Sequence, residues 1–144
     1  MNSPFVRRFL RILIEPGWAP FGVVLFHVTL AEFGLTHRFD HLLHFLGGAA
    51  IAYFFSRFLA LLSLIPTTSH SWLIYAATFT SSCTAALFWE FVEFASDTFL
   101  HTNVQQSLSE TMLDLLFGVL GATSSLTLIA LARLVLFKPH RPVS

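Results

Sequence analysis

The sequence predicts an all-α integral membrane protein, a bundle of four transmembrane helices with an N-terminal amphipathic helix at the membrane surface. Of its 144 residues, 55% are hydrophobic and only 11% are charged, whereas soluble domains carry about 25% charged residues. The mean hydropathy is +0.71. Four apolar stretches are long enough to form helices that cross the hydrocarbon core, which takes roughly 20 residues. We therefore expect a single membrane domain over residues 1–144, with the lipid bilayer as its partner and no nucleic acid.

The first predicted element is the surface helix, at about residues 4–15. Its arginines would lie among the lipid headgroups while its phenylalanines and leucines dip inward. The apolar run is broken at Glu15-Pro16-Gly17, and no convincing small-residue cleavage site follows. We therefore expect this helix to be retained in the protein rather than removed as a secretory signal.

The four predicted spans cover about residues 18–35, 40–65, 72–99 and 111–137. Two of them end at a proline, because Pro66 follows the second span and Lys138-Pro139 follows the fourth. These spans take up most of the sequence, so we expect no further domain within it.

The distribution of lysine and arginine predicts the orientation of the bundle. Basic residues lie before the first span and at the end of the fourth, whereas the loop over residues 98–109 has none. Because cytoplasmic segments carry an excess of lysine and arginine, both termini are expected in the cytoplasm. The opposite end, which is rich in acids and histidines, then faces outward.

The candidate functional residues gather at that outward end of the predicted bundle. They are His41 and His44 in the second span, Glu90, Glu93 and Asp97 in the third, and Glu110 and Asp114 in the fourth. Each helix carries polar and small residues on one stripe, as His44 with Gly48, Glu90 with Ala86, and Asp114 with Gly118. Since small residues mark close helix contacts in membranes, these polar groups should point toward one another.

Burying these acids requires a compensating charge. An acid near mid-membrane costs about 2.5 to 3.5 kcal/mol on insertion scales, so protons, a metal ion or a cationic substrate must balance the carboxylates. Imidazole with carboxylates is typical of zinc, iron or manganese sites. We predict a divalent metal site, with Glu110 or Asp97 as general base if the protein is an enzyme; the expected metal ligands are His44, Glu90, Glu93, Asp114 and His41. Alternatively, an acid or histidine in the first turn of a span lies at the level of the lipid headgroups and binds no metal.

Two polar residues of the first span are less informative. His27 and Glu32 are five positions apart and so point in different directions on a helix. Glu32 lies near the outer end and could join the cluster. For His27 a structural, hydrogen-bonded role is favoured over a cofactor ligand.

Three segments resemble a known family in the same order along the chain. Residues 40–48, DHLLHFLGG, resemble the opening of the second span of the YjdF-like membrane proteins, a group distantly similar to VanZ-like proteins. Residues 89–94, WEFVEF, resemble the E-x-x-E-aromatic helix of that family, and residues 110–122 resemble its closing helix. The resemblance implies a small multi-pass protein of the bacterial inner membrane with an outward polar site.

These features favour a metal-binding membrane protein, and three functions stay open. The first is metal-assisted chemistry on a membrane lipid or an envelope precursor. The second is a non-catalytic accessory subunit that packs against a larger membrane complex. The third, a proton or cation pathway, is weaker because the cytoplasmic half has no polar relay apart from Arg57. Whether the protein is an enzyme is not determined by the sequence.

Overall fold

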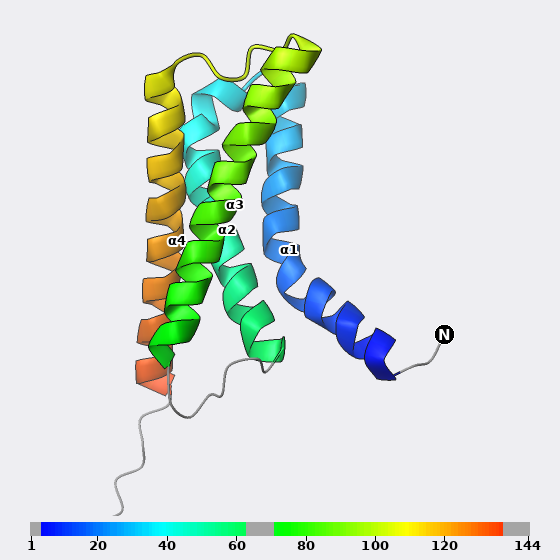
Figure 1. The fold of residues 1–144 in the computed structure, drawn as a ribbon, viewed down its shortest axis with the longest axis vertical. Coiled ribbons are helices and arrows are strands. Elements are labelled where there is room, and N and C mark those ends of the chain that lie inside the picture. The colour runs from blue at the N-terminus through cyan, green and yellow to red at the C-terminus, as the bar shows by residue number, and fades with distance from the viewer. Residues whose placement is uncertain (1–3, 63–70, 137–144) are drawn as a thin grey trace, which may run out of the picture.

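The computed structural model describes residues 4–62 and 71–136, which form four long helices and no strand (Figure 1). The helices are α1 (Pro4–Glu32), α2 (Thr36–Leu62), α3 (Ser71–Leu100) and α4 (Leu108–Leu136). The beginning of α1 and the end of α4 lie toward the same end of the bundle, and the α1–α2 and α3–α4 connections lie at the other (Figure 1). The prediction of an all-α membrane bundle is confirmed.

Three of the four helices are long and apolar enough to cross a membrane: residues Leu13–Glu32 in α1, Thr36–Leu61 in α2, and Leu108–Leu136 in α4. Helix α3 is 30 residues long but does not meet the same criterion of apolarity. Its middle carries several serines and threonines and its last turns carry three acids, which lower its hydropathy. The crossing predicted for residues 72–99 therefore remains a prediction.

Helix α1 differs from the sequence prediction. We expected a break at Glu15-Pro16-Gly17 between a surface helix and the first span, but Pro4–Glu32 is one helix with Pro16 and Pro20 inside it. Figure 1 shows that its N-terminal part bends away from the bundle. Proline removes a backbone donor and crowds the preceding turn, so it kinks a helix without necessarily ending it. Whether the bent part lies at the membrane surface stays a prediction.

The helix ends at the acid-rich side are set by local signals. Gly34, with φ 65°, allows the chain to leave α1, and the amide of Leu35 donates to the carbonyl of Leu30 at 2.8 Å. At the start of α4, the hydroxyl of Ser107 accepts a hydrogen bond from the amide of Glu110 at 3.2 Å. This serine–glutamate spacing is that of a capping box, so α4 begins before the expected residue 111. The predicted end of the second span at residue 65 lies outside the described residues.

Helix α2 is the centre of the bundle. It packs against α1, α3 and α4, whereas α1 has no backbone contact with α3 or α4 within the described residues. The contact between α2 and α4 is the closest, because a Cβ added at Gly48 would overlap the backbone of Gly118, and one added at Gly121 would overlap the carbonyl of Phe45. We call this contact the α2–α4 seam. It aligns the polar residues one turn above it on both helices.

Candidate functional site

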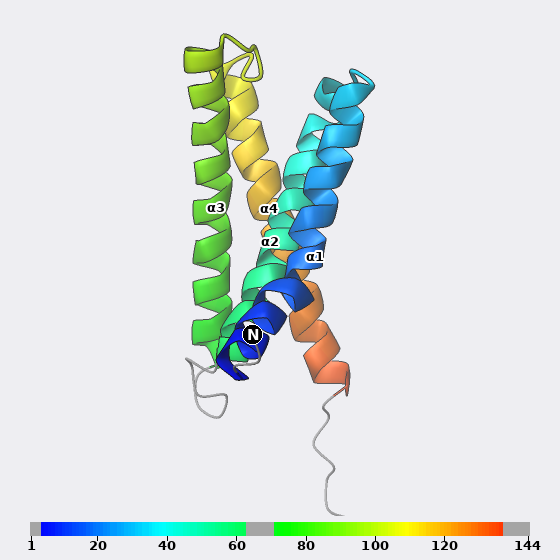
Figure 2. The ribbon, with the colours of Figure 1, turned by 90° about the vertical axis from the view of Figure 1, so that its right-hand side faces the viewer.

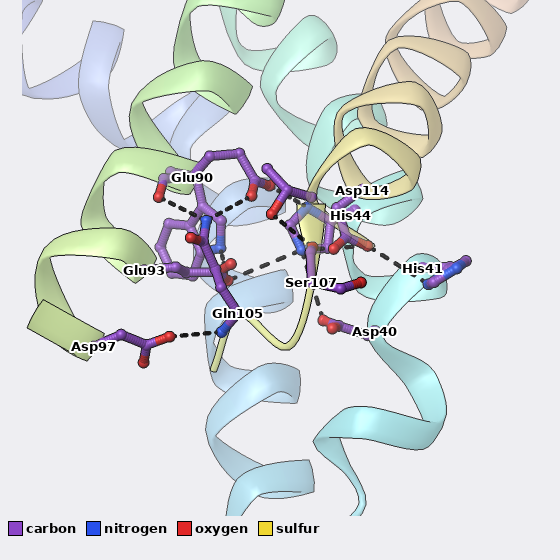
Figure 3. Close-up of polar contacts among 11 residues, drawn as sticks. Asp40, His41, His44, Glu90, Glu93, Asp97, Gln105, Ser107 and Asp114 are labelled. Atoms are coloured by element: carbon purple, nitrogen blue, oxygen red, sulfur yellow. Dashed lines mark hydrogen bonds and ion pairs between the residues drawn. The ribbon is translucent and has the colours of Figure 1, made fainter. Parts of the chain in front are cut away.

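The site is built around the imidazole of His44 on α2 (Figure 3). Its Nε2 lies 3.6 Å from Oδ1 of Asp40, 3.9 Å from Oε1 of Glu93 and 3.9 Å from Oδ1 of Asp114. Its Nδ1 lies 3.5 Å from Oε1 of Glu90. Three helices thus direct carboxylates at one histidine, and we call these five residues the His44 cluster.

Two carboxylate oxygens of the cluster are buried without a hydrogen-bond partner. Glu90 and Asp114 are only 3% and 4% exposed, and Oε1 of Glu90 and Oδ1 of Asp114 accept no hydrogen bond. A buried polar atom left unpaired costs free energy, and a buried charge left unpaired costs more. Oε1 of Glu90 faces Nδ1 of His44, whereas Oδ1 of Asp114 faces Nε2 of the same ring and Nδ1 of His41, so each side of the imidazole has one buried acceptor without a hydrogen bond.

The charges of the cluster do not balance. The cluster has four carboxylates and one imidazole, and within the described residues its only ion pairs are with His41 and His44. Even a protonated His44 would neutralise one carboxylate of four. A cation or shared protons must therefore complete the site.

The cluster contains residues that could hold a metal ion. Two overlapping groups offer ligand atoms that lie within 4.8 Å of one another, namely Asp40, His44 and Asp114, and His44, Glu90 and Glu93. Two atoms bound to one zinc ion at about 2.0 to 2.2 Å are at most about 4.4 Å apart. Each distance from His44 to a carboxylate of the cluster is below that limit.

The loop between α3 and α4 supports the cluster from above. The side-chain amide of Gln105 donates to Oε2 of Glu90 at 3.2 Å and to the carbonyl of Glu90 at 3.1 Å. Asp97 holds this loop, because its carboxylate accepts hydrogen bonds from the amides of Val104 and Gln105, both at 2.8 Å, and from the hydroxyl of Thr102 at 2.5 Å. On the other side of the cluster, the indole of Trp89 donates to Glu93 at 2.7 Å.

The structure places the sequence-predicted residues in three positions. His44, Glu90, Glu93 and Asp114 come together in the cluster. His41 lies at its edge, with Nδ1 3.5 Å from Oδ1 of Asp114 and its side chain 42% exposed, and it belongs to neither ligand group.

The two predicted general bases, Asp97 and Glu110, also lie outside both ligand groups. Glu110 is one turn before Asp114 at the start of α4, and its amide belongs to the helix cap. The carboxylate of Asp97 is already occupied by the loop hydrogen bonds. Asp97 thus holds the loop that carries Gln105, and a role of Asp97 or Glu110 as general base stays a prediction.

Sequence reasoning missed two residues of the site. Asp40 was not among the expected metal ligands, yet it is four residues before His44 and so lies on the same face of α2. That spacing was the available signal. Gln105 reaches Glu90 through a loop 15 residues away in sequence, and no local pattern indicates such a contact.

The polar residues of the first span do not join the cluster. Glu32 is exposed at the end of α1 and belongs to neither ligand group. His27 instead packs edge-on against Trp89, with ring centroids 6.0 Å apart and an interplanar angle of 79°. This ring contact joins α1 to α3 beside the cluster.

Fold and site together define an all-helical membrane protein with a buried histidine–carboxylate cluster near one end of its bundle. Residues 12–134 match the family described as "Predicted membrane protein (DUF2238)", which is the YjdF family. The chain belongs to this family, as the three sequence segments indicated. Searches of curated proteins and of solved structures found no match. The family identifies a membrane protein, and any more specific function rests on the site.

Proposed function

We propose that the protein is a metal-dependent membrane protein that holds a divalent ion, zinc, iron or manganese, at Nε2 of His44. The observation that carries the proposal is the pair of buried, unpartnered carboxylate oxygens on Glu90 and Asp114, both facing one imidazole. An ion on Nε2 would supply a partner for Asp114 and the missing positive charge, and it would leave Nδ1–H to donate to Glu90. Imidazole and carboxylate oxygens are the donors that these metals accept.

The distances from the two ring nitrogens of His44 to the carboxylates indicate which nitrogen would bind the ion. Three carboxylate oxygens, from Asp40, Glu93 and Asp114, surround Nε2, whereas Nδ1 faces only Glu90. With the ion on Nε2, the Nδ1–H group would donate to Glu90. A carboxylate in that position fixes the ring and raises its basicity as a ligand. We therefore assign Asp40, His44 and Asp114 as ligands, Glu93 as a further ligand within reach, and Glu90 as the residue that orients His44.

Such an ion would polarise a bound substrate oxygen or activate a water molecule. The surrounding side chains would orient the ligands. Glu90, which accepts a hydrogen bond from Gln105, would orient the imidazole of His44, and Trp89 donates a hydrogen bond to Glu93. His41 lies at the exposed edge beside Asp114. The remaining carboxylates could accept a proton. The site lies in the bundle near a membrane surface, so we propose a membrane lipid or an envelope precursor as the substrate, in line with the distant resemblance to VanZ-like proteins.

The proposed location is the bacterial inner membrane, with all four helices crossing it and both termini in the cytoplasm. The arginines of the first and last turns support this orientation through the excess of basic residues in cytoplasmic segments. The His44 cluster lies in the half of the bundle away from these residues (Figures 1 and 3). It would then be reached from the outer side.

The test is metal content, measured by mass spectrometry on detergent-purified protein, for wild type and matched variants. We expect a stoichiometric ion in wild type and its loss in His44→Ala and Asp114→Asn. Glu90→Gln should retain the ion with affinity weakened about 10- to 100-fold, as is typical of residues that orient a ligand. Glu32→Gln, which neutralises an exposed acid outside the cluster, is the control and should bind as wild type does.

Each alternative has a distinct outcome. Complete loss of metal in Glu90→Gln with retention in Asp40→Asn would move the ion to the group of His44, Glu90 and Glu93. A folded, helical wild type without metal after reconstitution would contradict the proposal. In that case protons shared among the carboxylates, or docking of the cluster onto a larger membrane complex as an accessory subunit, would take its place. Copurification of a stoichiometric partner would identify the latter.

A further inference from the structure

A cavity of about 200 Å³ adjoins the His44 cluster. It lies between α1 and α3, over a floor provided by α2 and by Gly118 of α4. Val23 and Val24 of α1, Ile51 of α2 and Ala85 of α3 line it, and His44 lies at its polar end. The cavity is thus apolar along most of its wall and ends at the cluster.

The polar groups of the wall are few and mostly engaged. The hydroxyl of Ser82 already donates to the carbonyl of Thr78 at 2.8 Å, and the indole of Trp89 donates to Glu93 at 2.7 Å. A polar molecule in this space would find few partners other than the imidazoles of His44 and His27, and an unpaired polar group in such a place is costly. The cavity therefore suits a hydrocarbon chain.

The cavity is placed for entry from the bilayer. Helices α1 and α3 have no backbone contact with each other within the described residues, and in the view of Figure 2 their ends nearest the cluster lie apart. The side-chain contact of His27 with Trp89 joins them at the cavity wall. The outer faces of both helices expose large apolar side chains, Phe21 at 68% and Phe88 at 62%, which suit a lipid surrounding. A chain of a lipid could thus enter sideways between α1 and α3.

The charge of the cluster selects the head of that lipid. The cluster has four carboxylates and no lysine or arginine, so its carboxylates outnumber the two positive charges that one divalent ion would bring. An anionic head would be repelled at this distance, whereas a hydroxyl, an ester carbonyl or an amine would not.

We infer that the cavity receives the hydrocarbon chain of an amphiphile with a neutral or cationic head, and that the head lies at the His44 cluster. The inference deepens the proposed function by naming its substrate class, and it rests on that function for the role of the head. The chain-binding part depends only on the cavity.

The experiment uses single-chain alkyl probes that carry a photoactivatable diazirine in the chain and either an amine or a carboxylate as the head. Full-length protein in lipid nanodiscs is labelled and the labelled residues are mapped by peptide mass spectrometry. We expect the amine probe to label residues of the cavity wall, and the carboxylate probe to label them less. Gly47→Leu should abolish the cavity labelling, because Gly47 lines the cavity and a Cβ there meets nothing within 4 Å.

Gly22→Leu is the matched control. Gly22 is a helical glycine that also has nothing within 4 Å of a built Cβ, but it is exposed on α1 and does not line the cavity. Its labelling should equal that of wild type. Equal cavity labelling in wild type and Gly47→Leu, or labelling confined to the outer faces, would overturn the inference.

Metal content in the same samples separates the two proposals. Specific cavity labelling of a wild type that binds no metal would leave the chain site standing and remove the proposed metal function. Stoichiometric metal without cavity labelling would support the proposed metal function and remove the chain site. Preference for the carboxylate probe would overturn the assignment of the head.

Discussion

The two sides of α2 are built in opposite ways. Toward α4 it presents Gly48, and the backbones meet so closely that no Cβ fits. Toward the space between α1 and α3 it presents Gly47, where a Cβ would meet nothing within 4 Å. Adjacent glycines in one helix thus differ in the room beside them, and Gly48 and Gly118 of the closed contact also form one edge of the cavity that Gly47 lines. The closed side fixes His44 and Asp114 relative to each other, and the open side leaves a cavity beside His44.

The difference between the two sides of α2 is tested most strongly by adding one methyl group at either glycine, Gly48 or Gly47. Gly48→Ala should destabilise the bundle by about 1–3 kcal/mol or more, because the new Cβ overlaps the backbone of Gly118 and neither helix can rearrange cheaply. Gly47→Ala should be neutral or slightly stabilising, because alanine favours the helix by up to about 1 kcal/mol over glycine. Thermal unfolding in detergent, followed by circular dichroism, measures both.

The same two glycine variants also test the His44 cluster. Gly48→Ala should also weaken metal binding, since displacement of α4 moves Asp114 away from His44. Equal stability of the two variants would show that the seam is not as tight as its geometry indicates.

A smaller effect on metal binding should come from the loop between α3 and α4, which contacts Glu90 through Gln105. In Asp97→Asn one acceptor oxygen is replaced by a donor. Either the amide of Gln105, which donates to Oδ2, or both the amide of Val104 and the hydroxyl of Thr102, which donate to Oδ1, then lose their acceptor. Gln105 would then hold Glu90 less firmly. We expect metal affinity to fall by less than about tenfold, since this residue acts one step further from the ion than an ordinary orienting residue.

Metal titration of the purified protein measures the change, and Thr102→Val, which removes a single donor, should have a weaker effect of the same sign. An affinity lost completely in Asp97→Asn would indicate that Asp97 contacts the ion itself, contrary to the geometry.

The smallest effect on stability and metal content should come from the ion pairs between α1 and α2 at the end of the molecule away from the His44 cluster. Arg57 of α2 pairs with Glu15 of α1 at 2.6 Å, and Arg11 pairs with Glu15 at 3.0 Å. Both arginines are substantially exposed, and exposed ion pairs contribute little to stability. Glu15→Gln should leave thermal stability and metal content unchanged within error. Hydrogen exchange should rise only in the N-terminal part of α1, and protection lost throughout α1 would show that this pair anchors the whole helix.

The sequence predicted the class of fold and the core of the site for a definite reason. Hydropathy and helical spacing are local properties, so they located four helices and placed His44, Glu90 and Asp114 on small-residue stripes that the structure brings together. The helix through Pro16 was missed because proline lowers the probability of a helix without excluding one. Gln105 was missed because its contact depends on how a loop folds back.

The arrangement of α2 and α4 has a consequence for biosynthesis. The partners of the seam, Gly48 and Gly118, are separated in the chain by all of α3, so the ribosome releases α2 well before α4 exists. During that interval His44 has Asp40 beside it but lacks Asp114, and the glycine face of α2 lacks its cover. The nascent bundle must wait in an incomplete state that exposes polar groups to lipid or to the insertion machinery. The last helix to be made therefore closes both the fold and the site, and truncation within α4 should leave neither.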